Sequence, residues 1–225
     1  MDGSRQTHWI PLADLMTGMM MIFMLITAIY ISYVERTTTI VLDEYKDIKN
    51  DMQLALQDEF KDSFKQWDAE LLGDMTIRFN NPNVQFAVQS STLKPEFKDI
   101  LRDFFPRYMK IIRSNKFKNV VKEIRIEGHT SMFWKGASSE TEAYFLNMGL
   151  SQERTRSTLN FLMSLPVFKD DKNWFIAHIT ANGLSSSRPI IKTPRSLKED
   201  EINQRVEFRI VTNAADRIDQ LITVK

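Results

Sequence analysis

Residues 9–34 read WIPLADLMTGMMMIFMLITAIYISYV, and Asp14 is the one charged side chain among them. A helix that crosses a bilayer needs about 20 predominantly apolar residues, so this stretch is long enough. A secretory signal peptide has an apolar core of about 7–15 residues and ends in small residues at its cleavage site. Here the apolar run is longer and ends in Tyr30-Ile31-Ser32-Tyr33, which is a poor cleavage site. We therefore predict an uncleaved transmembrane helix over residues 9–34.

The residues on either side of this run indicate how it is oriented. The tail at residues 1–8 carries Arg5, His8 and the amino terminus, whereas the chain after Glu35-Arg36 becomes acidic. Positive charge favours the cytoplasmic side of a membrane. We therefore expect a short cytoplasmic tail at 1–8, with everything after residue 34 outside the cytoplasm.

The charge of the chain is divided unevenly along its length. The 225 residues have a formal net charge of only +1, but residues 1–34 carry −1, residues 35–72 carry −5 and residues 73–225 carry +7. The overall composition, with 26% charged residues, excludes a polytopic membrane protein and a disordered chain. The absence of cysteine excludes a disulfide scaffold, a thiolate zinc site and a cysteine nucleophile.

Residues 35–72 are expected to form an amphipathic helical stalk or linker. Apolar residues recur there every three or four positions, as on one face of a helix, and Gly73-Asp74 is expected to end the helix. The apolar face needs a partner, which is either a second copy of the chain or the domain that follows. The apolar positions are Val41, Tyr45, Ile48, Met52, Leu56, Phe60, Phe64, Trp67 and Leu71.

Residues 73–225 have the pattern of an α+β domain that is large enough for its own core. Ser151 is expected to cap the second long helix, with Glu153 in its first turn. Pro106 is expected to kink or break the first long helix. The expected order is strands at 75–80 and 83–88, a helix at 95–115, a strand at 120–127, a helix at 150–165, a strand at 175–181, a loop at 183–198, a strand at 204–212 and a short helix at 214–221.

Asp14 is the first residue that could carry chemistry. A charged side chain in the hydrocarbon costs roughly 2.5–3.5 kcal/mol on insertion scales, and such residues usually face a partner or a water path. A carboxyl in that position could carry a proton. The alternative is that Asp14 lies close to water near the helix start and complements the helix dipole, because Pro11 suits a first helical turn.

The sequence contains no sign of an enzyme, a metal site or a cofactor site. GxSxG, GxGxxG, Walker-type and HExxH motifs are absent, and His8, His129 and His178 show no metal-ligand spacing. The basic C-terminal segment has Lys and Arg scattered among acids without a basic stripe, so we expect no direct binding of nucleic acid. For a domain outside the cytoplasm, an anionic cell wall is a better candidate than nucleic acid, and the alternative is that the charge simply forms a solvated surface.

Two groups of motifs carry a family resemblance. The stretch PLADLMTGMMMIFMLI (11–26) resembles the membrane helix of B-type stator subunits such as MotB, in which a single Asp followed by Leu-Met carries protons. The remainder resembles the OmpA-like peptidoglycan-binding domain, through IRIEGHTS (124–131), NMGLSQERTRSTLNFL (147–162) and INQRVEFRI (202–210). Together these motifs cover nearly the whole chain in the expected order.

Within this superfamily the chain most resembles the B subunits of Zorya anti-phage defence systems. The compact length, the short N-terminal tail, FFPRYMKI (104–111) and the GHTS form of the loop all fit them. Flagellar MotB subunits are the alternative, but they carry a longer basic tail and usually GHTD. A passive cell-wall anchor that conducts no ions is a further alternative, in which Asp14 would be a solvated residue at the helix start.

The resemblance implies a mechanism and a set of partners. Two copies of this chain would form a homodimer whose first helices run through a ring of five A-type, multi-span subunits, and Asp14 would alternately take up and release a proton. The subunit would be a single-pass protein of the bacterial inner membrane, with its OmpA-like domain at 73–225 in the periplasm. Torque or a signal would reach cytoplasmic defence effectors indirectly.

The resemblance also implies a peptidoglycan site formed by Asn147, Leu150, Arg154 and Arg205. The family uses an Asp and an Arg to hold the charged ends of a diaminopimelate stem peptide. The Arg corresponds to Arg154, but Ser131 stands at the Asp position and cannot supply a carboxylate for an ammonium group. This puts binding by the usual pair in doubt, and the alternative is that binding persists through Asn147, Leu150, Arg154 and Arg205, with other polar groups substituting for the carboxylate.

Overall fold

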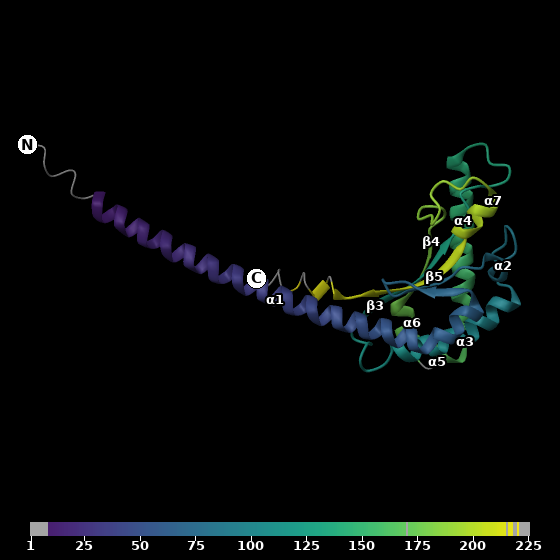
Figure 1. Cartoon of the computed structure of the whole chain (residues 1–225), viewed down its shortest axis with the longest axis horizontal. Coiled ribbons are helices and arrows are strands. Elements are labelled where there is room, and N and C mark those ends of the chain that lie inside the picture. The colour runs from purple at the N-terminus through teal and green to yellow at the C-terminus, as the bar shows by residue number, and fades with distance from the viewer. Residues whose placement is uncertain (1–8, 170, 215, 218–219, 221–225) are drawn as a thin grey trace, which may run out of the picture. The chain divides into compact units, whose positions relative to one another are not determined.

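The computed structural model describes residues 9–169, 171–214, 216–217 and 220. The expected tail at 1–8 and part of the short helix expected at 214–221 lie outside the described residues. The described chain forms two compact units, one containing residues 9–46 and the residues after 213, the other Asp47–Asn213. Helix α1 (Trp9–Trp67) contributes to both units (Figure 1).

The first unit exposes the apolar side chains of α1. Within the described part of the chain, α1 is the one helix that is long and apolar enough to cross a membrane, and its most apolar window buries no side chain. The hydroxyls of Thr17 and Thr27 donate to the carbonyls of Ala13 and Phe23, at 2.8 and 2.7 Å. Since these hydroxyls are satisfied within the helix, they need no water.

The C-terminal end of α1 belongs to the core of the second unit. One face of the helix is buried there at four- and three-residue spacing, by Met52, Leu56, Phe60, Phe64 and Trp67. The helix ends at Trp67, so the expectation that it continues to Gly73-Asp74 is wrong. Asp68 adopts a left-handed conformation (φ 50°), which cannot continue the helix, and the chain turns directly into a strand.

A five-stranded sheet forms the centre of the second unit, with strand order β1-β2-β5-β3-β4. All neighbouring strands are antiparallel except β3 and β4, which are parallel. This is the expected α+β class. The strands are β1 (Ala69–Leu71), β2 (Thr76–Phe79), β3 (Val121–His129), β4 (Ile179–Gly183) and β5 (Arg205–Thr212). The remaining helices are α2 (Pro82–Gln85), α3 (Pro95–Ile112), α4 (Glu140–Met163), α5 (Pro166–Lys169), α6 (Lys172–His178), α7 (Leu197–Asp200) and the 3-10 helix η1 (Glu201–Asn203).

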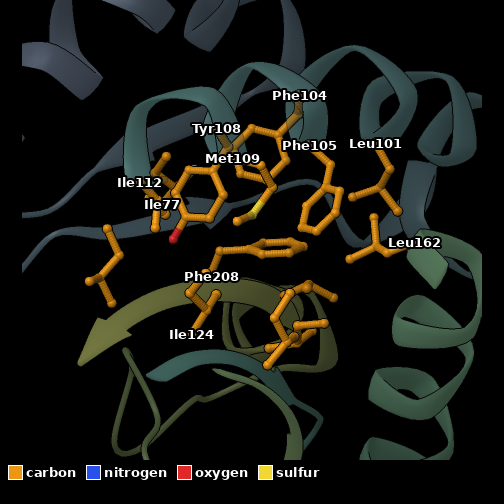
Figure 2. Packing of buried hydrophobic residues seen from close by; sticks show 14 of the residues in the cluster. Ile77, Leu101, Phe104, Phe105, Tyr108, Met109, Ile112, Ile124, Leu162 and Phe208 are labelled. Carbon is orange, nitrogen blue, oxygen red and sulfur yellow. The ribbon is translucent and has the colours of Figure 1, made fainter. Parts of the chain in front are cut away.

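The two faces of the sheet differ in chemistry because side chains alternate along each strand. Val206, Phe208 and Ile210 of β5 are buried in the apolar core. Figure 2 shows Phe208 beneath Phe104 and Tyr108 of α3, and the rings of Phe104 and Phe208 have centroids 5.0 Å apart. The opposite face carries the charged residues of β2, β3 and β5, which form the ion-pair network described below.

The structure corrects three local expectations through helix caps. Residues 82–85 form α2 rather than a strand, because the Asn81 side chain accepts a hydrogen bond from the Asn83 amide and Pro82 occupies the first helical turn. Helix α4 begins at Glu140, capped by Ser139, so Ser151 is an interior residue and not a cap. Residues 172–178 form α6, capped by Asp171, so the strand expected at 175–181 begins only at Ile179.

Pro106 does not interrupt α3, which runs as one helix from Pro95 to Ile112. Phe104 and Phe105 before the proline and Tyr108 after it are all completely buried. Packing of these rings on both sides of Pro106 offsets the lost backbone hydrogen bond.

Candidate functional site

Asp14 lies in the exposed apolar section of α1. Within the described residues, no cation lies within ion-pair distance of its carboxylate. Thr17 and Gly18 follow three and four positions later, which places them next to Asp14 on the helix surface. A Cβ added at Gly18 would meet no atom within 4 Å. The surface beside Asp14 therefore carries small side chains and is open, and the described residues supply no charged partner for the carboxylate.

The second candidate site is a pocket of about 240 Å³ in the Asp47–Asn213 unit. It is lined by the loop after α2, the loop after β3, helix α4, and α7 with η1. Ser131, Asn147, Leu150 and Arg154, which the sequence predicts to act together, all line it. The structure thus brings these four predicted residues into one pocket.

Asn147 holds the loop after β3 in place. Its side-chain amide donates a hydrogen bond to the main-chain carbonyl of Phe133 at 3.1 Å. Its main-chain carbonyl accepts one from the Thr130 hydroxyl at 3.2 Å. Asn147 is 1% exposed, so its role in the pocket is to brace Thr130–Phe133. The shape of the pocket wall depends on this brace.

Two glycines allow α4 to approach the sheet closely. A Cβ at Gly128 would lie 2.6 Å from the Thr155 side chain and 3.0 Å from the Ser151 carbonyl oxygen, and one at Gly183 would overlap the backbone of Gln152. Glycine is required at both positions because a larger residue would force the helix away. This close packing fixes the position of Arg154 on α4.

Arg154 contributes a buried guanidinium to the pocket. Its Nε donates to the Ser90 carbonyl at 2.9 Å, one Nη donates to the Ala87 carbonyl at 3.3 Å, and the group lies 4.9 Å from the centroid of the Phe86 ring. Burial lowers the pKa of Arg154 to about 10, so the side chain stays protonated at neutral pH. No carboxylate of the described residues forms an ion pair with it.

Asp200 is the pocket residue that the sequence interpretation missed. Ser131 Oγ donates a hydrogen bond to one carboxylate oxygen of Asp200, and the Asn203 side-chain amide donates to the other at 2.9 Å. The main-chain amide of Met132 lies 3.2 Å from both oxygens. The available signal is Ser196-x-x-Glu199, a capping pattern that starts α7 and so places Asp200 at its end.

Arg205 does not line this pocket. Its Nε donates to Glu207 Oε1 at 2.6 Å, and its two terminal nitrogens donate to the carbonyls of Asn203 and Arg188 at 2.9 and 3.0 Å. Arg205 is thus engaged within the polar face of the sheet. It supports the chain segment that carries Asn203 and η1.

The polar face of the sheet contains a buried ion-pair network around Glu207. Glu207 Oε1 also accepts from Arg78 Nε at 2.7 Å, and His129 Nε2 lies 3.4 Å from Glu207 Oε2. Burial alone would raise the pKa of Glu207, but His129 and Arg205 outweigh it and hold the pKa well below its usual value. Burial lowers the pKa of His129, which favours the neutral imidazole.

Glu127, His129 and Glu207 are the described residues that could hold a metal ion, since their ligand atoms lie within 4.8 Å of one another. Arg205 and Arg78 already contact Glu207, and Arg188 lies 3.5 Å from Glu127. A divalent cation would therefore add positive charge to a region where arginines already balance the carboxylates. We interpret this cluster as a structural ion-pair network.

Comparison with solved structures defines the fold class. A MotB-like protein from Desulfovibrio vulgaris aligns with a TM-score of 0.51 and 18% identity, over 78% of this chain and 98% of the other. The cell wall anchor of the type VI secretion system from Pseudomonas aeruginosa aligns with a TM-score of 0.50 and 20% identity, over 70% of this chain and 96% of the other. The chain therefore shares its fold with this MotB-like protein and with this cell wall anchor.

Sequence comparison identifies the family. No known protein-family profile matches the chain. The Zorya protein ZorB of Escherichia coli is 38% identical over 221 residues, which cover 96% of this chain and 92% of ZorB. With this identity over nearly the full length of both proteins, the chain belongs to the ZorB family, as the sequence motifs predict.

Proposed function

We propose that this protein is the B subunit of a proton-driven, stator-like membrane motor that acts in anti-phage defence. The observation that carries the proposal is Asp14, the one charged side chain in the exposed apolar section of α1, in a chain of the ZorB family. The subunit has no enzymatic activity of its own in this proposal. It supplies an ion-binding carboxyl and a cell-wall anchor.

The proposed topology places residues 9–34 in the bacterial inner membrane. Residues 1–8 lie in the cytoplasm, residues 35–46 form the linker and the unit at Asp47–Asn213 forms the peptidoglycan-binding domain in the periplasm. Because the chain contains no cysteine, Lys118→Cys adds a single thiol at an exposed position. A membrane-impermeant maleimide should label it in cells with a permeabilised outer membrane, and protection of the thiol there would contradict the topology.

In the proposed proton step, the Asp14 carboxyl is neutralised on one side of the membrane and ionised again toward the other. The membrane potential contributes about 2.3 kcal/mol per elementary charge per 100 mV. The carboxyl needs a surrounding partner, for which we propose five copies of a multi-span A-type subunit around a homodimer of this chain. Thr17 and Gly18 support this arrangement, since small residues allow membrane helices to approach closely.

In the proposed anchoring step, the domain binds peptidoglycan through the pocket that contains Ser131, Asn147, Leu150 and Arg154. The buried Arg154 guanidinium supports a site for an anionic group, because it lacks a carboxylate partner in the described chain. Arg205 does not line the pocket, but it holds the segment that carries Asn203 by donating a hydrogen bond to the Asn203 carbonyl. Cytoplasmic effectors receive the output of the motor indirectly, without contact of this chain with nucleic acid.

Asp14→Asn tests the proposal, because it keeps the size of the side chain and removes the titratable group. We expect loss of anti-phage protection at unchanged protein level. The matched control is Asp58→Asn, the same change at an exposed position of α1 outside the apolar section. Full protection by the Asp14→Asn variant would support a passive anchor instead. Rescue of swimming in a stator-deficient strain, with no effect on plaques, would support a flagellar stator.

A further inference from the structure

The peptidoglycan pocket contains a second buried charge, of opposite sign to Arg154. Asp200 is 1% exposed and lines the same pocket as Arg154, which is 7% exposed. No Lys, Arg or His of the described residues lies within ion-pair distance of the Asp200 carboxylate. Both charges thus remain without a counterion inside the described part of the chain.

Unpaired buried charges are costly, and proteins normally pair them. The neutral donors around Asp200 are a hydroxyl from Ser131, an amide from Asn203 and the Met132 main-chain amide, so they orient the carboxylate without neutralising it. Arg154 is likewise oriented by two carbonyls and by the Phe86 ring. Its Nη1 has no hydrogen-bond partner among the described residues.

We propose that Asp200 and Arg154 form the two ends of a site for a zwitterionic group, in which Asp200 binds an ammonium and Arg154 binds a carboxylate. This inference rests on the proposed binding of peptidoglycan through the charged end of a stem peptide, and what it adds is Asp200 as the source of the carboxylate that binds the ammonium. The Ser131–Asp200 hydrogen bond explains how the loop after β3 functions without its own carboxylate. Ser131 positions the acid that α7 supplies.

The first test is Asp200→Asn, measured as co-sedimentation of the full-length detergent-solubilised protein with purified peptidoglycan. Asparagine keeps the size of the side chain and removes its charge. We expect the affinity to fall at least tenfold. Glu153→Gln is the matched control, because Glu153 is an exposed acid on α4 outside the pocket lining, and it should bind within twofold of the unmodified protein.

A second readout separates recognition of an ammonium from a merely structural role of Asp200. Acetylation of the free amines of peptidoglycan should weaken binding of the unmodified protein at least tenfold. It should weaken binding of the Asp200→Asn protein by less than twofold, because that variant has already lost the interaction. Equal sensitivity of both proteins to acetylation would overturn the assignment of Asp200.

A double variant that moves the carboxylate to another position tests the proposal even if Asp200→Asn fails to fold. The double variant Ser131→Asp with Asp200→Ser moves the acid across the existing hydrogen bond, and binding should remain within threefold. A folded double variant that no longer binds would contradict the proposal.

Arg154→Ala tests whether this pocket binds peptidoglycan at all. If it loses binding while Asp200→Asn keeps it, wall binding stands and the inference fails; if both variants bind fully, the pocket is not the wall site.

Discussion

Both ends of α1 carry large apolar side chains, but the surroundings of these side chains differ. Leu25 is 63% exposed, in a section where the described residues bury none of the apolar side chains, whereas Leu56 on the same helix is completely buried in the core of the sheet domain. The part of the chain that the structure describes covers one end only. Burial of apolar surface is the main favourable term in folding, so we propose that a bilayer and partner helices from outside the chain cover the exposed end.

This difference also separates the two functions that we propose. The sheet domain completes its own core and forms a pocket from its own loops, so it can present a wall-binding site as a single chain. Asp14 has no partner in the described chain, so the proposed ion pathway exists only in an assembly. In this proposal, one subunit combines a self-sufficient anchor with an incomplete channel.

The largest expected effect is on the amount of protein in the membrane, and it tests whether lipid or water surrounds the exposed leucines of α1. Leu25 and Leu54 are 63% and 62% exposed in the chain. Lys at the centre of a membrane helix costs roughly 2.5–3.5 kcal/mol on insertion scales, whereas Lys at a solvated position costs little. We expect Leu25→Lys to deplete the carbonate-resistant membrane fraction strongly and Leu54→Lys to leave it unchanged. Equal membrane levels of the two variants would contradict a bilayer around Leu25.

A second pair of variants tests the covered end of the helix. Leu56→Ala removes a completely buried side chain, and such changes cost about 2–5 kcal/mol of unfolding free energy. Leu54→Ala, two residues away and exposed, should cost less than about 0.5 kcal/mol. Denaturant-dependent proteolysis of the full chain measures both values. A small effect of Leu56→Ala would show that the end of α1 is not part of the domain core.

The smallest expected effect is the response of the sheet domain to acid. The folded pKa of His129 lies below its ordinary value, since burial opposes the charged form in surroundings that include Glu207, Arg205 and Glu127. The unfolded chain then binds more protons, and stability decreases as the pH falls below about 6.5. The loss is limited to about 1.4 kcal/mol per pH unit for one proton.

His129→Gln should remove this slope between neutral pH and the pH at which carboxylates begin to titrate. The lowered pKa of Glu207 produces a separate loss at lower pH, because its ion pairs contribute above its ordinary pKa of 4.5 and disappear as the folded group protonates. Urea unfolding at several pH values measures both parts. An unchanged slope in the His129→Gln protein would mean that the pKa of His129 is the same in the folded and the unfolded chain.

The sequence predicts the apolar helix and the fold class well because both depend on local patterns. The run from Trp9 to Val34 is evident from composition, and the alternation in 204–212 identifies β5. The helix boundaries were less predictable, because Ser139 and Asp171 compete with other capping residues nearby. The continuation of α3 through Pro106 depends on tertiary packing, which local sequence patterns do not predict.

The pocket was predictable in part, for a related reason. Ser131, Asn147, Leu150 and Arg154 lie in motifs within 24 residues of one another. Asp200 joins them through a hydrogen bond to Ser131 that spans 69 residues of sequence. That contact requires residues 184–196 to fold back over α4, so motif spacing could not reveal it.

The most direct test of the central claim is proton flux through vesicles that contain this subunit together with its A-type partner. With an imposed membrane potential, we expect proton uptake by the unmodified assembly and by the Asp58→Asn control. The Asp14→Asn assembly should show no flux above vesicles without protein. Equal flux through the Asp14→Asn assembly, at equal protein content, would contradict the proposed role of Asp14.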